Sequence, residues 1–391
     1  MRSKIFRDRE KLSAKFIPYF SPYRDHHLGR LKEIFTPILK GSRLPAQAVV
    51  VGGIGSGKTM TAKQLMRHLE SLAGERGVPL LGVYVDCRKE RTPGSVVRCL
   101  ASLFSPQLPL RGFTVEETFF AALREAVKRE LAILMVLDGA DLILRNHQDM
   151  GHLLSRVSEV RPNRGAPSLL ITLRSLSVFS EMDPSSVSGL RKNVIGLEDY
   201  DRDQLTTIVE HRVKGAFKRG SMSKESVRAC VDLASEHGFN VKYALELLAR
   251  AGDLAESAGS RAVSLDHIRS ASREVSPLFA FDELGDLSVH EKLVLFSSAQ
   301  ALGSSKRPYL TMGELEETYG RSCVKHGVRP LKHTRLWSVV GTLSQLGFIQ
   351  KRISGPGLRG RTTLIELPVE SKKSLSRELS TLLKGELSRV F

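Results

Sequence analysis

The sequence predicts an α/β protein in which a parallel sheet, built around a P-loop, is followed by a helical lid and a C-terminal winged helix. Three observations lead to this prediction. The glycine-rich motif GGIGSGKT, at 52–59, stands between an apolar strand and a helical stretch. Strands alternate with helical patterns up to residue 197, which is typical of a parallel sheet with crossover helices. Near the C-terminus, three helical patterns precede a β-hairpin.

The elements of the sheet region can be placed from hydropathy periodicity. An arm and one helix, at 26–39, come before the motif. We expect strands at 48–51, 80–86, 131–138, 168–172 and 193–197, and helices at 60–72, 93–104, 115–130 and 147–160. A complete strand, 80–86, separates the P-loop from the strand that ends in an acid. This order favours AAA+ and related ATPases, with a strand inserted into the sheet, over nucleotide kinases.

The rest of the chain is predicted to form two further domains. Only helical patterns appear from 201 to about 275, and 277–285 has the composition of a linker. The C-terminal block shows helices at 289–302, 312–326 and 332–346 and strands at 348–353 and 363–367. The expected domains are 1–197 (nucleotide-binding core with an N-terminal arm), 198–277 (helical lid) and 286–391 (winged helix).

The P-loop is the candidate nucleotide site. Its amides can turn around a phosphate, its lysine can reach the β and γ oxygens, and its threonine hydroxyl can ligate Mg²⁺. The predicted residues are Gly52, Gly53, Ile54, Gly55, Ser56, Gly57, Lys58 and Thr59. Asp138 ends the third strand, and we predict that it holds Mg²⁺ together with Thr59. The expected ligand is ATP or ADP, and the sequence leaves open which of the two is bound.

Charge points to nucleic acid as a partner. Lys and Arg total 59 against 42 Asp and Glu, which gives a net charge of +17. Between 288 and 367 there are twelve basic and five acidic residues. The expected DNA contacts on the third helix are Lys332, Thr334, Arg335 and Ser338, and those on the glycine-rich loop 354–362 are Arg359 and Arg361. Trp337, also on this helix, is expected in the core.

Two further features concern the compartment. The four cysteines are widely separated, with no CxxC pair, which favours a reduced, intracellular protein. No apolar run approaches the length of a membrane span. We therefore expect a cytoplasmic, nucleoid-associated protein without a membrane partner.

With these pieces in place, the chain resembles the archaeal replication initiators, relatives of the origin recognition complex and cell-division-control ATPases. The resemblance rests on the P-loop and on the stretches IFRDREKLSAKFIPYFSPYRD, VYVDCRKERTP, GLEDYDRDQLTTIVEHRVKGAF, KYALELLARAGDLAE and LSVHEKLVLF, in that order. It implies that Tyr200 and Arg212 contact the nucleotide and that Lys242 stands in place of the second sensor arginine. It also implies duplex origin DNA as a partner, with paralogous initiators as a further class.

The departures from this family concern hydrolysis. Gly139 follows Asp138 where the family has a glutamate that polarises the attacking water, and Asp141, three residues on from Asp138, is a candidate substitute. Leu173 stands where the family has a polar sensor, and leucine cannot bond a γ-phosphate. Weak or absent ATP hydrolysis is the expectation. The alternatives are a transcriptional regulator or element-encoded DNA-binding protein on the same scaffold, and an active ATPase motor or helicase loader.

Overall fold

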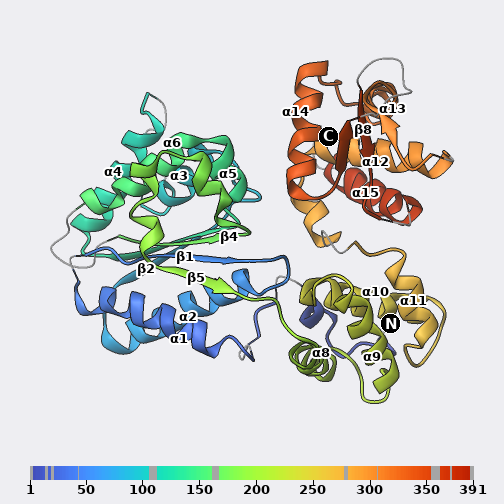
Figure 1. Ribbon diagram of the computed structural model, residues 1–391, viewed down its shortest axis with the longest axis horizontal. Coiled ribbons are helices and arrows are strands. Elements are labelled where there is room, and N and C mark those ends of the chain that lie inside the picture. Colours follow the sequence, from blue (N-terminus) through green and yellow to red (C-terminus); the bar gives the residue numbers. More distant parts are fainter. Residues whose placement is uncertain are drawn as a thin grey trace. The chain divides into compact units, whose positions relative to one another are not determined.

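The computed structural model divides into two compact units (Figure 1). The sheet unit comprises residues 17–200, and the lid–wing unit comprises residues 1–16 together with 201–391. The residues described are 3–13, 16–18, 22–42, 44–104, 112–160, 167–276, 281–305, 307–353, 362–369 and 372–387. In these ranges, no helix is both long and apolar enough to cross a membrane.

The sheet unit is built on parallel strands in the order β2-β3-β4-β1-β5. Their bounds are β1 (Gln47–Gly52), β2 (Leu80–Asp86), β3 (Ala132–Asp138), β4 (Ser168–Leu173) and β5 (Val194–Leu197). The five predicted strands agree with these bounds to within one residue. β3 and β4 are buried along their whole length, which explains their nearly continuous apolar sequence. The strand inserted between the P-loop strand β1 and the acid-ended strand β3 is β4, while β2 lies at the edge.

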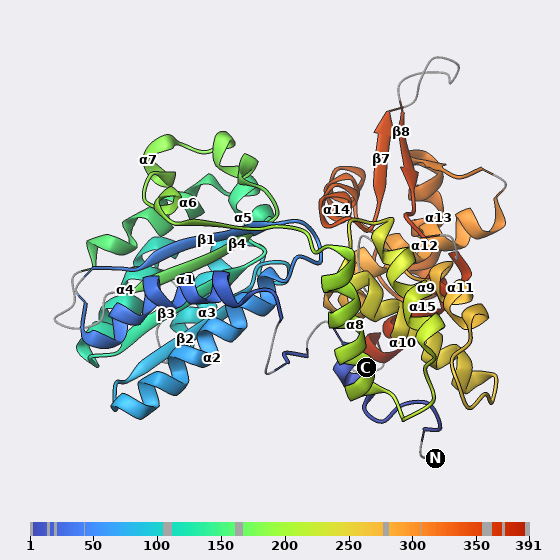
Figure 2. The same ribbon diagram turned by 60° about the horizontal axis from the view of Figure 1, so that its bottom comes forward.

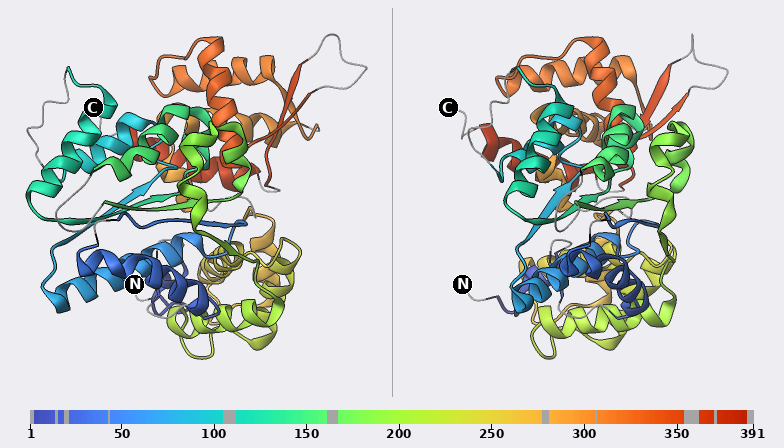
Figure 3. Two further views of the ribbon diagram at one scale, coloured as in Figure 1. Left: turned by 60° about the vertical axis from the view of Figure 1, so that its left-hand side comes forward. Right: turned by 90° about the vertical axis from the view of Figure 1, so that its left-hand side faces the viewer.

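Helices cover both faces of this sheet, as Figures 1 and 3 show. One face carries α1 (Asp25–Phe35) and α2 (Lys58–Arg76). The other face carries α3 (Pro93–Ala101), α4 (Val115–Lys128), α5 (Asp141–Asn146), α6 (Gln148–Ser155) and the short α7 (Pro184–Val187). The 3₁₀ turns of the described chain are η1 (Arg9–Leu12), η2 (Thr36–Lys40), η3 (Arg156–Glu159), η4 (Leu176–Glu181), η5 (Leu190–Lys192) and η6 (Phe281–Asp286). The two helical layers exclude water from both sides of the sheet, so polar groups reach solvent mainly at the strand ends.

The lid is a bundle of helices, as the sequence predicts. It contains α8 (Arg202–Ala216), α9 (Lys224–Ser235), α10 (Val241–Ser257) and α11 (Leu265–Ser272). The carboxylate of Asp201 caps α8 by accepting a hydrogen bond from the Gln204 amide, and the Gln204 side-chain oxygen accepts one from the Asp201 amide. This cap starts the lid directly after the end of the sheet unit.

The first part of the N-terminal arm, residues 1–16, groups with the lid, whereas the sequence placed the whole arm in the core domain 1–197; the arm from residue 17 onward lies in the sheet unit, as predicted. Ile5, Phe6 and Leu12 are buried in the same cluster as the lid helices. The ring of Phe6 lies 5.1 Å from that of Phe217, and it fills the space that a Cβ at Gly252 would need. The apolar stretches of this segment are short, so their hydropathy does not indicate which domain they pack against.

The C-terminal domain has the predicted winged-helix elements. Its helices are α12 (Val289–Ser304), α13 (Met312–Lys325), α14 (His333–Leu346) and α15 (Lys372–Leu387). Its antiparallel sheet contains β6 (Leu310–Thr311), β8 (Thr363–Glu366) and β7 (Gln350–Ile353), in the order β6-β8-β7. Figure 2 shows α14 with the β7–β8 hairpin. The two-residue strand β6 was not predicted, because so short a run has no periodicity.

The closing helix α15 seals this domain against α12. Leu375, Leu379 and Leu383 are fully buried, at the spacing of one helical face. Lys292 of α12, also fully buried, forms an ion pair with Glu386 of α15. Because a buried charge without its partner is costly, this pair fixes how the two helices meet.

Candidate functional sites

The P-loop connects β1 to α2, and its glycines shape it. Gly55 and Gly57 have φ angles of 82° and 93°, in the left-handed region that glycine adopts without strain. At Gly52 a Cβ atom would lie 2.5 Å from the carbonyl oxygen of Leu197 on the neighbouring strand β5. The loop ends at Lys58, the first residue of the 19-residue helix α2. Backbone amides at the start of a helix attract anions, so this loop is suited to a phosphate group.

The ammonium group of Lys58 lies against its own loop. Its Nζ atom donates hydrogen bonds to the carbonyl oxygens of Gly52 (2.7 Å) and Gly53 (2.6 Å). Burial, and then the nearby guanidinium of Arg174, lower the pKa of Lys58 from 10.5 to about 8. A cation that has lost much of its hydration is stabilised by an anionic partner. The side chain is therefore suited to the phosphate oxygens that the sequence assigns to it.

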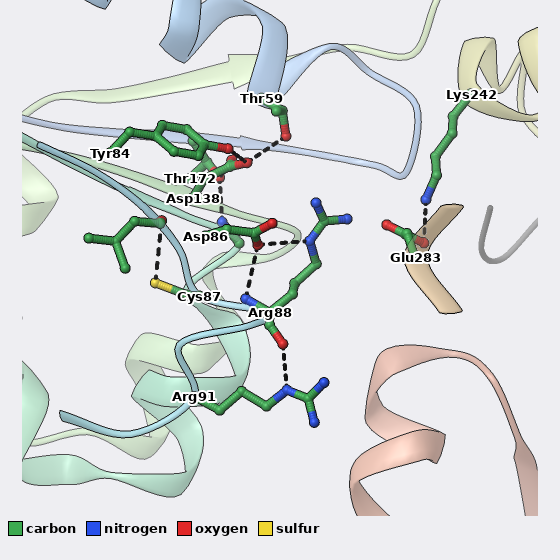
Figure 4. Close-up of polar contacts among 12 residues, drawn as sticks. Thr59, Tyr84, Asp86, Cys87, Arg88, Arg91, Asp138, Thr172, Lys242 and Glu283 are labelled. Carbon is green, nitrogen blue, oxygen red and sulfur yellow. Dashed lines mark hydrogen bonds and ion pairs between the residues drawn. The ribbon is translucent and has the colours of Figure 1, made fainter. Parts of the chain in front are cut away.

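Asp138 is the centre of a hydroxyl network (Figure 4). Its carboxylate is buried, and one oxygen, Oδ2, accepts hydrogen bonds from the hydroxyls of Thr59 and Tyr84, both at 2.7 Å. The other, Oδ1, accepts a hydrogen bond from the hydroxyl of Thr172 at 2.5 Å. The fold thus brings together Thr59 and Asp138, the two residues predicted to hold Mg²⁺. A carboxylate beside a hydroxyl is an oxygen-rich donor set of the kind that Mg²⁺ prefers.

Tyr84 and Thr172 are the members of this network that the sequence reasoning missed. Thr172 is a polar residue inside the apolar run of β4, and this interruption could have identified it as a candidate site residue. Nothing in the sequence of β2 distinguishes Tyr84 in the same way. Burial raises the pKa of Tyr84, and the charge of Asp138 raises it further, so this phenol stays protonated and donates. The two residues converge only because β2 and β4 lie on either side of β3.

The far end of the phosphate site contains the residues that depart from the family pattern. Gly139 has a φ angle of 69°, and a Cβ atom there would lie 3.4 Å from Cγ of Arg88. Leu173 is fully buried in the core on the α3–α7 side of the sheet. Asp141 accepts a hydrogen bond from the backbone amide of Arg174 at 2.8 Å. The carboxylate beside Asp138 on the neighbouring strand, Asp86, is paired with Arg88 at 3.2 Å, so it is also engaged by a cation.

Tyr200 lies beside the P-loop. The side chain is buried, and its hydroxyl is 3.0 Å from the position of a Cβ atom on Gly57. The guanidinium of Arg24 stacks 4.0 Å above the ring. Arg24 also donates hydrogen bonds to the carbonyl oxygens of Ser56 (3.1 Å) and Glu198 (2.5 Å). Arg24 was not expected from the sequence, and it links the P-loop, the segment after β5 and Tyr200.

Arg212 and Lys242, the other predicted nucleotide contacts, lie in the lid–wing unit. Arg212 is buried, donates a hydrogen bond to the carbonyl oxygen of Lys11 at 2.8 Å and lies 5.2 Å from the ring of Phe16. Burial lowers the pKa of Arg212 to about 10. Lys242 pairs with Glu283 at 2.7 Å (Figure 4). Their role at the phosphates stays a prediction, while the structure gives both side chains contacts within their own unit.

The third helix of the winged-helix domain, α14, has the predicted two faces. Its inward residues are Leu336, Val340 and Leu343. Its exposed residues include the four predicted DNA contacts Lys332, Thr334, Arg335 and Ser338. Lys332 occupies the N-cap position, without a side-chain capping hydrogen bond, at the helix start where recognition helices approach base edges. Arg359 and Arg361, the predicted contacts on the loop, lie outside the described residues.

Trp337 corrects the sequence reading. It was expected in the core, but its side chain is 44% exposed. The physical reason is the helical rotation of about 100° per residue, which turns position 337 away from the stripe of Leu336, Val340 and Leu343. The ammonium of Lys351, on β7, lies 5.3 Å from the centre of the indole.

Comparison with family models divides the chain in the same order. Residues 45–177 match a model described as an AAA domain. Residues 206–273 match the Cdc6 AAA+ ATPase-type lid domain, and residues 282–377 match the CDC6 C-terminal winged helix domain.

Full-length relatives agree with these matches. The ORC1-type DNA replication protein 1 of Aeropyrum pernix is 30% identical over 373 residues, covering 95% of this chain and 93% of the relative. The ORC1-type DNA replication protein 2 of Sulfurisphaera tokodaii is 29% identical over 395 residues, with coverage of 98% and 94%. The solved structure of the Aeropyrum pernix ORC1 protein in complex with DNA has a TM-score of 0.76 and 28% identity, and the match covers both chains completely. This chain therefore belongs to the ORC1-type DNA replication proteins, the ORC1/Cdc6 family of replication initiators.

Proposed function

We propose that this initiator binds ATP or ADP at its P-loop, binds duplex origin DNA through its winged helix, and hydrolyses ATP slowly or not at all. The nucleotide part is supported chiefly by the arrangement of Lys58, Thr59 and Asp138. A partly desolvated ammonium lies at the start of α2, and a hydroxyl–carboxylate pair lies beside it. The loop amides and Lys58 would bind the phosphates, and Tyr200 would pack against the base.

Thr59 and Asp138 fit a magnesium ion. The ion would be held by the Thr59 hydroxyl and, directly or through water, by the Asp138 carboxylate, and it would supply positive charge to the phosphate oxygens. Tyr84 and Thr172 orient the carboxylate through their hydroxyls. We expect them to hold Asp138 in one rotamer whether or not the cation is bound.

Slow hydrolysis is supported by three positions next to this site. Gly139 has no side chain, Leu173 is packed in the core, and Asp141 is tied to the Arg174 amide. These three positions therefore supply no group aimed to polarise an attacking water, while Lys58 and Arg174 bring positive charge that favours retention of bound phosphates. The site accordingly suits a stable nucleotide-bound state better than turnover.

DNA binding is supported by the exposed, basic start of α14 and by the relative solved in complex with DNA. Lys332 and Arg335 stand where side chains of a recognition helix meet the major groove. We propose that the duplex is bound on this face, with origin DNA as the specific target.

The nucleotide proposal is tested by calorimetric titration with ADP and ATP and by steady-state turnover. We expect tight binding, little turnover, and loss of binding in Lys58→Ala. Robust ATP hydrolysis by the isolated chain, abolished in Asp138→Asn, would contradict the proposal of slow hydrolysis.

The DNA proposal is tested by nuclease footprinting on fragments of the source genome. Protection at replication origins supports the initiator role, whereas protection confined to promoters would favour a transcriptional regulator on the same scaffold.

A further inference from the structure

We propose that Trp337 and Lys351 form a second DNA contact, distinct from the polar start of α14, in which the indole packs against deoxyribose and base-edge methyl groups. Lys351 would bind an adjacent phosphate. The inference rests on the proposed DNA binding by the winged helix and assigns a new part of that surface. We call these two residues, with Ile353, the α14–β7 patch.

The first observation is where the indole lies on α14. Residues three and four apart share a helical face, so Trp337 stands above Thr334 and below Gly341 on the outward side. A Cβ atom on Gly341 would meet nothing within 4 Å, so the surface beside the indole is open. Trp337 thus continues the predicted contact face by one turn, away from the helix start.

The second observation is the cation held against the ring. Every residue of β7 is exposed, and the ammonium of Lys351 lies 5.3 Å from the indole centre. Arg352 is paired with Glu366 at 2.7 Å, whereas no carboxylate within the described ranges forms an ion pair with Lys351. Lys351 therefore keeps its charge available for a phosphate.

The third observation is the apolar neighbour on the strand. Ile353 is 64% exposed and lies two residues after Lys351, so both project from the same face of β7. An exposed cation–π pair stabilises a fold only weakly, and it does not account for two large apolar side chains at one surface. Trp337 shares its side of α14 with Thr334, and Ile353 shares its face of β7 with Lys351, in a segment that carries twelve basic and five acidic residues between 288 and 367. This charge suits a polyanion, and apolar contact with thymine methyls and sugars is a known way of reading a groove.

The chain contains one tryptophan, so the inference can be tested on the unmodified protein. The probe is a mixed-sequence duplex of about 30 base pairs, roughly three helical turns, carrying a fluorescent label for anisotropy. Binding should change the emission of Trp337 and make it severalfold less accessible to acrylamide. If the duplex binds, as anisotropy shows, while emission and quenching stay the same, the inference is wrong and the proposed function stands.

Variants separate the two side chains. Trp337→Ala should weaken binding by roughly fivefold or more, and Trp337→Phe should retain most of the affinity. The matched apolar control is Val324→Ala, which truncates a residue on α13 that is 77% exposed. Wild-type affinity in Trp337→Ala, with wild-type thermal melting, would overturn the inference.

The lysine is tested by salt dependence. Lys351→Ala should reduce the slope of log affinity against log salt by about one, whereas Lys384→Ala, the same charge change at an exposed position of α15, should leave it unchanged. An equal change in both variants would assign the Lys351 effect to net charge and overturn its phosphate contact. If the wild-type chain binds no duplex at any salt, the proposed function fails and this inference fails with it.

Discussion

Replacement of Arg24 by alanine should weaken nucleotide binding, although Arg24 is not among the residues predicted to touch the nucleotide. Its guanidinium holds the Ser56 carbonyl of the P-loop and the Glu198 carbonyl, and it stacks on Tyr200. Without it, the loop and the tyrosine lose their common support. We therefore expect the nucleotide site to be less preorganised in the variant.

The magnitude follows from these contacts. Two hydrogen bonds from a charged donor contribute about 1.5–3 kcal/mol each, and a desolvated cation–π contact about 2 kcal/mol. Water entering the vacated space recovers part of this. We expect the free energy of unfolding of the sheet unit to fall by about 3–4 kcal/mol and the affinity for ADP to fall by about tenfold or more.

The assay must report on the sheet unit alone, because the single tryptophan lies in the lid–wing unit. Hydrogen exchange of peptides from β1 and α2 measures its local stability, and calorimetry measures ADP binding. Arg24→Lys keeps the charge but loses the planar fork, so it should be intermediate. Arg30→Ala removes an exposed arginine from α1, the helix that begins directly after Arg24, and should leave both quantities unchanged. An Arg24→Ala variant with wild-type exchange and wild-type affinity would refute the reasoning.

Three further predictions follow from the sites. Gly139→Glu should restore little ATP turnover, because the backbone φ angle of 69° at this position strains a residue other than glycine by about 1–2 kcal/mol and because Leu173 stays apolar. Fast turnover in this variant would contradict this account. The affinity for ADP should fall as the pH rises above about 8, because Lys58 then has to take up a proton when the anion binds. Calorimetry in buffers of different ionisation enthalpy measures that proton uptake. Binding that does not depend on pH would show that Lys58 does not titrate in this range. Arg335→Ala should cost about 1–3 kcal/mol of DNA affinity and relax sequence preference, whereas Arg359→Ala and Arg361→Ala should weaken binding to all duplexes alike; competition binding with variant sequences distinguishes the two classes, and equal effects on every duplex would show that Arg335 does not read a base.

Sequence alone explains only part of how the phosphate site departs from the family pattern. The absence of a glutamate after Asp138 is visible in the sequence. The backbone conformation of Gly139 is not, and it explains why a single substitution there is a poor repair. The role of Thr172 is also not visible in the sequence. Its hydroxyl accepts a hydrogen bond from the Gly139 amide and donates one to the Asp138 carboxylate, which ties the ends of β3 and β4 together. The contact between β3 and β4 makes this possible.

The N-terminal arm and Trp337 show two limits of pattern reading. The arm consists of short apolar stretches with no long periodicity, so its partner, the lid core, could be found only from the packing of Phe6 against Phe217. The periodicity of α14 did identify Leu336, Val340 and Leu343 as inward. The general tendency of tryptophan to be buried then gave the wrong expectation for its neighbour, whose direction was already set by the helical rotation.

Local sequence was sufficient for the strands of the parallel sheet, for most helices, for the P-loop and for the order of lid and winged helix, because periodicity, glycine conformation and caps depend on residues within a few positions of each other. Long-range contacts decided the rest. Arg24 and Glu198 are 174 positions apart, and Tyr84, Asp138 and Thr172 come from three different strands. Such groups meet only when the strand order β2-β3-β4-β1-β5 has formed, and that order is fixed by burial of both sheet faces rather than by any one segment.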